Sequence, residues 1–196
     1  MTVVADVLTN GRDGRLARQR AFPRWLTVAL VFLVVAGFAA DRWQRQREVD
    51  QVLHGAVSGR QSVYFAEARV GGMLQYLTPV LFRDGLTPSM QSSLDGLLQQ
   101  AASEGTQSLR ESRAALGGTF VLPWHHEARA ARDAYVVYLD AVIAKYEAAS
   151  RDASTLFQTD PAIREDFMTA LSALRTAVPH PDLQHGIELV KAGYRS

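Results

Sequence analysis

Five histidines have the widest chemical range in this chain, because imidazole ligates metal ions and titrates near neutral pH. They are His54, His125, His126, His180 and His185. Neighbouring residues on a helix point about 100° apart, so His125 and His126 cannot easily bind one ion. His180 and His185 span a proline-broken turn. The spacing favours ordinary surface or capping histidines, and a metal site or a pH-sensitive cluster is the weaker alternative.

Catalytic motifs with a known mechanism do not occur in the sequence. There is no G-x-S-x-G, Walker, H-E-x-x-H or G-x-G-x-x-G pattern, and no Glu-x-x-His pair of the di-iron type. The absence of cysteine excludes disulfides, thiolate metal sites and cysteine nucleophiles. We therefore expect a protein that is not an enzyme and has no cofactor, no catalytic residues and no bound metal.

A second group of candidate residues forms the apolar stretch Phe-Val-Leu-Pro-Trp between two predicted helices. Exposed apolar patches rimmed by polar residues usually contact a partner or a membrane. The candidate contact residues are Phe120, Val121, Leu122 and Trp124. The alternative is that this loop folds over the end of the helices and completes their core.

Aromatic and basic residues recur at helical spacing elsewhere in the chain. Tyr135, Tyr138 and Tyr146 fall on one helical stripe, which is more typical of core than of a ligand pocket. The arginine-rich faces around Arg110 and Arg132 alternate with acidic residues, which is typical of a solvated, ion-paired surface.

The element that must place these residues is the uncharged stretch 25–40, Trp-Leu-Thr-Val-Ala-Leu-Val-Phe-Leu-Val-Val-Ala-Gly-Phe-Ala-Ala. Its sixteen residues span roughly 24 Å as a helix, and Arg24 and Arg42 can extend towards lipid headgroups on either side. Trp25 and Trp43 bracket it, as interfacial tryptophans do. We expect a retained transmembrane signal anchor over 22–40. A cleaved signal peptide is the alternative.

Basic residues predict the orientation of this anchor, because cytoplasmic flanks are enriched in Lys and Arg. Ahead of it lie Arg12, Arg15, Arg18, Arg20 and Arg24. Beyond it, arginines are mixed with acidic residues. We expect a bacterial cytoplasmic membrane protein that crosses once, with its N-terminus cytoplasmic and its bulk extracytoplasmic. The bacterial assignment follows only from the abundance of Ala and Arg.

Apolar periodicity predicts an all-α fold, an up-down-up-down four-helix bundle with a short C-terminal helix. The expected parts are a flexible basic tail (1–21), the anchor (22–40), the bundle (41–178) and a C-terminal tail (179–196). The expected bundle helices are about 41–78, 88–116, 124–150 and 160–178. Proline at position 79 should end the first of them.

Two packing features follow from the same periodicity. A heptad seam of small and apolar residues runs along the first helix through Val49, Val52, Ala56, Gly59, Val63, Ala66, Val70, Met73, Leu77 and Val80. The weakly apolar stretch 103–106 predicts a loosely packed middle for the second helix.

The expected function is that of a non-catalytic accessory or interaction subunit. Its partners would be the lipid bilayer and a membrane protein or a second copy, and the net charge of +1 gives no reason to expect nucleic acid. In the predicted topology the 117–124 loop lies within about 15 Å of the headgroups. A ligand-sensing bundle that signals through a separate partner is the alternative, and metal handling through the histidines is a weaker one.

Overall fold

The computed structural model describes residues 24–84, 87–178 and 184–192. It divides the chain into two compact units, Met1–Trp43 and Gln44–Ser196, and the second is called the helical domain below. The described residues form five α-helices and one short 3-10 helix, and they contain no strand. The prediction of an all-α fold is therefore confirmed.

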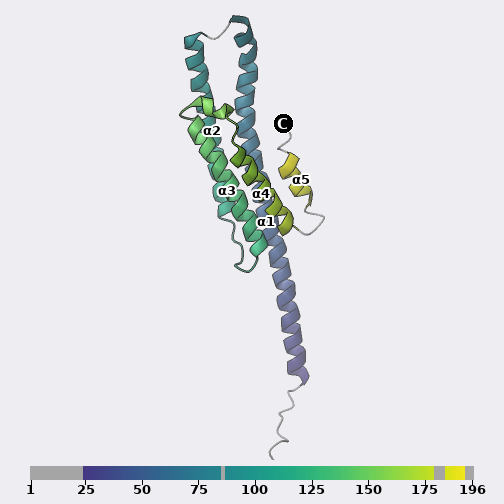
Figure 1. Cartoon of the computed structure of the whole chain (residues 1–196). Coiled ribbons are helices and arrows are strands. Elements are labelled where there is room, and N and C mark those ends of the chain that lie inside the picture. The colour runs from purple at the N-terminus through teal and green to yellow at the C-terminus, as the bar shows by residue number, and fades with distance from the viewer. Residues whose placement is uncertain (1–23, 85–86, 179–183, 193–196) are drawn as a thin grey trace, which may run out of the picture. The chain divides into compact units, whose positions relative to one another are not determined.

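The elements follow one another with short connections (Figure 1). They are α1 (Arg24–Asp84), α2 (Pro88–Gly117), α3 (His126–Ala149), the 3-10 helix η1 (Ala153–Phe157), α4 (Pro161–Ala177) and α5 (Gln184–Ala192). The sequence did not predict η1.

The helix starts follow the expected capping chemistry. The Thr87 hydroxyl accepts a hydrogen bond from the Met90 amide before α2, and the Asp160 carboxylate accepts one from the Ala162 amide before α4. Each helix then begins with a proline, whose missing N–H has no intrahelical partner at that position in any case.

The first helix continues further than the sequence predicted. An end near position 79 was expected, whereas α1 reaches Asp84. The residue before a proline avoids the α region in most proteins but not in all of them. A proline inside a helix removes one hydrogen bond, the one to the carbonyl four residues earlier. The hydrogen bonds on either side of Pro79 are enough to continue the helix.

The N-terminal part of α1 contains the apolar stretch. Among the described residues, one helix is long and apolar enough to be a candidate membrane span, and none of its most hydrophobic stretch is buried. Its large side chains are exposed, among them Leu30, Phe32, Leu33 and Phe38. A core helix of a soluble protein would bury such side chains.

Within the helical domain, α1 and α2 run in opposite directions. The Ser62 and Ser112 hydroxyls lie 2.7 Å apart, and further along α1 Arg69 forms an ion pair with Glu104. As residue numbers rise on one helix they fall on the other, so α2 returns along α1. Figure 1 shows the two helices side by side.

The α3 helix reverses the direction of the chain again. Arg110 pairs with Glu147 at 2.6 Å and Arg113 with Asp140 at 2.8 Å, so α3 is antiparallel to α2. The α3 helix in turn packs extensively against α4. The seam predicted on α1 is buried from Val49 to Val70, and the side chains at its far end, Leu77 and Val80, lie outside the described residues.

The middle of α2 is closely packed, so the prediction that it would be loose is wrong. Gly105 is buried, and a Cβ atom built on it would lie 3.0 Å from the Ala66 Cβ atom and 3.4 Å from the Tyr146 ring. The stretch 103–106 contributes little apolar surface of its own. It is closely packed because Gly105 has no side chain, which lets α1 and α3 approach its backbone. Composition alone misrepresents such a position.

A substitution at Gly59 should show how closely α1 approaches α3. A Cβ atom there would lie 3.1 Å from the Tyr135 ring and 3.2 Å from the Leu139 side chain, both fully buried. We expect Gly59→Leu to destabilise the domain by about 1 to 3 kcal/mol through overpacking.

The matched control for this variant is Gly72→Leu in the same helix, where nothing lies within 4 Å of the added atom. There the gain in helix propensity should stabilise the domain by roughly 0.5 to 1 kcal/mol. Urea titration of the full chain in detergent micelles measures both variants. Shifts of equal sign and size would contradict the close approach.

Candidate functional site

The loop between α2 and α3, residues 118–125 and called the contact loop below, divides its apolar side chains between core and surface. Val121 is buried at 6% exposure and belongs to the core, and Leu122 is half-buried. Phe120 and Trp124 are 69% and 60% exposed. The loop therefore completes the core with one part and presents two aromatic rings with the other.

The backbone of the contact loop is held by side chains from α3. A guanidinium N–H of Arg132 donates to the Thr119 carbonyl at 3.0 Å, and one of Arg129 donates to the Pro123 carbonyl at 3.2 Å. These bonds fix carbonyls that no helix satisfies. The exposed rings consequently project from a loop with a defined backbone.

A buried carboxylate on α1 also holds the contact loop in place. One Glu48 oxygen lies 2.6 Å from the His125 Nδ1 atom and accepts the Leu122 amide hydrogen at 3.2 Å. Its other oxygen accepts from the Gln44 amide at 2.9 Å. The Glu48 and His125 side chains are 1% and 4% exposed. Because an ionised carboxylate only accepts hydrogen bonds, the His125 Nδ1 atom carries the hydrogen of this contact.

The environment of Glu48 determines its protonation. Burial disfavours the carboxylate and by itself raises the pKa of Glu48, but the hydrogen bonds from His125, Gln44 and the Leu122 amide lower it. The net effect is a pKa below the ordinary glutamate value. Glu48 is thus ionised at neutral pH and ties the loop to α1 as a charged acceptor.

This shift predicts a pH dependence of stability. A carboxyl group whose pKa is lower in the folded state than in the unfolded state stabilises the fold while it is ionised. This stabilisation is fully present above the unfolded-state pKa and is lost as the pH falls through the folded-state pKa. We expect Glu48→Gln to destabilise the domain most at pH 7, and less and less below about pH 4. Urea midpoints of both proteins between neutral and acidic pH measure this. A difference that stays constant would contradict the assignment.

The histidines do not come together as a site. His125 is buried against Glu48, so its expected role as a surface or capping residue is wrong, and it makes no side-chain cap although it precedes α3. His54, His126 and His185 are exposed, and His180 lies outside the described residues. In the described ranges, no three His, Asp or Glu side chains are grouped in a way that could hold a metal ion.

Sequence reasoning missed Glu48. In the sequence it is one of several mixed charges that follow the apolar stretch, but it comes immediately before Val49 and four residues before Val52, both buried on the seam. A carboxylate at a core-facing helical position was the available signal. Its partner could not be inferred, because His125 lies 77 positions away.

The tyrosines lie in the core and the arginines on an ion-paired surface, as the sequence predicts. Tyr135, Tyr138 and Tyr146 are buried, with the Tyr135 and Tyr138 rings 5.3 Å apart, as expected for core. Arg110 and Arg113 form exposed ion pairs, but with acidic residues of α3. Pairing between helices was invisible in the sequence, where only nearby charges could be matched.

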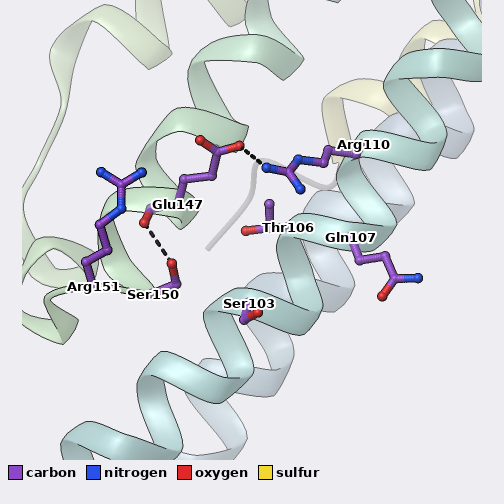
Figure 2. A pocket seen from close by; sticks show the side chains of 7 residues that line it. All are labelled: Ser103, Thr106, Gln107, Arg110, Glu147, Ser150 and Arg151. Atoms are coloured by element: carbon purple, nitrogen blue, oxygen red, sulfur yellow. Dashed lines mark hydrogen bonds and ion pairs between the residues drawn. The ribbon is translucent and has the colours of Figure 1, made fainter.

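A polar hollow of about 400 Å³ lies between α2 and α3. Figure 2 shows Arg110 extending from α2 towards Glu147 of α3, with Thr106, Ser103 and Gln107 along the α2 side. Arg110 is 64% exposed on its side chain and already ion-paired. The hollow therefore offers polar groups but no enclosed cavity.

Comparison with protein-family models, curated proteins and solved structures gives no match for this chain.

Proposed function

We propose that the protein is a non-catalytic, single-pass membrane protein that presents a helical bundle outside a bacterial cytoplasmic membrane as an accessory or interaction subunit. The observation that supports this most is the apolar part of α1, whose most hydrophobic stretch is not buried at all. Burial in a bilayer would remove these apolar side chains from water. They include the Phe32 and Phe38 rings, each more than 70% exposed.

The architecture in this proposal is an up-down-up-down arrangement of α1 to α4 that follows the anchor in the chain. The opposed directions of α1 and α2 and of α2 and α3 support it, as do the buried core residues that all four helices contribute. Basic residues ahead of the anchor support a cytoplasmic N-terminus. The contact surface is the contact loop, through the four candidate residues Phe120, Val121, Leu122 and Trp124. Val121 supports the surface from the core, and the two exposed rings meet the membrane or a membrane partner.

Two experiments on native membranes test this function. The full chain should remain in the membrane after carbonate washing, whereas Leu33→Arg in the centre of the apolar stretch should release a fraction of it, because an arginine there costs about 2.5 to 3.5 kcal/mol. The matched control is Val137→Arg, at an exposed position of α3, which should stay bound. Release of the unaltered chain by carbonate would refute the anchor.

Crosslinking in the same membranes tests the interaction role. We expect the purified full chain to carry a specific protein partner or a second copy, identified by mass spectrometry. A chain that migrates alone at every crosslinker concentration would remove support for a subunit, while leaving the anchor untouched.

Ligand sensing is the second candidate, and the polar hollow between α2 and α3 is the observation that favours it. Small polar ligands should then raise the unfolding temperature of the full chain, and Arg110→Gln should abolish the shift. No stabilisation across amino acids, sugars and phosphate would count against sensing.

A further inference from the structure

We infer that the contact loop binds the interfacial region of the bilayer that α1 enters, with the Phe120 and Trp124 rings among the headgroups. This inference rests on the proposed anchor and names the lipid surface as the occupant of the loop. The helical domain would then contact the membrane through a second segment of the chain, in addition to the anchor.

The side chains of the loop have the composition of an interfacial contact. Tryptophan and phenylalanine rings are stabilised by partial immersion at the boundary between headgroups and acyl chains. Both rings are mostly exposed, while Val121 beside them is fixed in the core. A pair of rings on a fixed base can enter a lipid surface without an ordering cost for the loop.

The backbone of the loop is prepared for a less polar medium. A carbonyl that leaves water must find an internal donor, and Thr119 and Pro123 have donors from Arg132 and Arg129. The Leu122 amide and carbonyl are satisfied by Glu48 and by the His125 amide. Immersion would therefore leave these groups paired.

Charge around the loop also suits a lipid surface. Arg45, Arg129 and Arg132 lie around it with two carboxylates, Glu127 paired with Arg45 and Asp133 paired with Arg132. With the buried Glu48 carboxylate counted, three arginines face three acids, so the surroundings of the loop carry no excess negative charge that would repel anionic headgroups.

Chain connectivity limits how far the loop can be from the membrane. Its anchoring residue Glu48 comes eight residues after Ala40, the last residue of the apolar stretch. Eight residues span about 12 Å as a helix, and at most about 28 Å if fully extended. The lipid surface is thus the binding partner that lies within reach of the loop through the chain's own anchor. A protein partner would require a second chain.

Quenching by brominated lipids tests this contact directly. The full chain with Trp25→Phe and Trp43→Phe keeps Trp124 as its single tryptophan, and is reconstituted in vesicles of phosphatidylcholine and phosphatidylglycerol. Bromine near the headgroup end of the acyl chains should reduce its emission roughly twofold, since an interfacial ring lies at that depth. The matched control replaces all three tryptophans by phenylalanine and introduces Phe157→Trp on η1, at a position 60% exposed. It should show no quenching.

Further single-tryptophan chains separate this inference from the anchor. If Trp124 is not quenched while a chain that keeps only Trp43 is, the loop proposal is overturned and the anchor stands. If neither Trp43 nor Trp25 is quenched in its own single-tryptophan chain, the anchor fails and the loop proposal fails with it. A photoreactive residue at position 120 should crosslink to lipid in native membranes, and a crosslink to protein alone would overturn the lipid assignment.

Discussion

Replacing His125 by phenylalanine should destabilise the helical domain by about 2 to 3 kcal/mol, because the buried Glu48 carboxylate loses its shortest hydrogen bond. Phenylalanine keeps the ring and its packing, so the loss reports the hydrogen bond rather than a cavity. Glu48 retains Gln44 and the Leu122 amide, which limits the penalty. Urea titration of the full chain in micelles measures the effect.

The control for this variant is next to it in the chain. His126 is exposed, and His126→Phe should change stability by less than about 0.5 kcal/mol. A double-mutant cycle with Glu48→Gln should give a coupling energy above about 1 kcal/mol for His125 and none for His126. Equal effects of the two histidine substitutions would show that the buried pair does not stabilise the loop.

Replacing Phe167 by alanine should cost about 3 to 5 kcal/mol, the largest single loss expected in the domain. Phe167 is 1% exposed on α4, and its ring lies 5.1 Å from the Tyr138 ring. The buried Arg60 guanidinium of α1 lies 5.8 Å from the centre of the same ring. Truncation would leave a cavity where α1, α3 and α4 meet and remove a contact to a buried cation.

Phe157 supplies the control for this substitution. It is 60% exposed on η1, and Phe157→Ala should change the free energy of unfolding by less than about 0.5 kcal/mol. The difference between the two phenylalanines therefore tests whether α4 packs as described. A small effect at Phe167 would place the core elsewhere.

Local patterns in the sequence predicted much of this fold, because caps and periodicity act over a few residues. Thr87 and Asp160 begin α2 and α4 as expected. The seam from Val49 to Val70 is buried. Each of these depends on neighbours within one or two helical turns, which a single sequence displays.

What could not be predicted depends on contacts between distant positions. The Glu48–His125 pair and the role of Gly105 need two or three helices to be in place before they have any meaning. The candidate loop was found from its composition, but only the structure divides it into a core residue, Val121, and two exposed rings. The end of α1 was missed because proline biases a helix without forbidding it.

The central proposal is that the chain crosses a membrane once and presents its helical domain on the far side. The chain has no cysteine, so single cysteines can be introduced without background at Thr9→Cys, ahead of the apolar stretch, and at Ser154→Cys, an exposed position of η1. In intact bacteria, a membrane-impermeant maleimide should label position 154, and should reach position 9 only after permeabilisation. Labelling of position 9 in intact cells, or a mature chain that has lost it, would contradict the account.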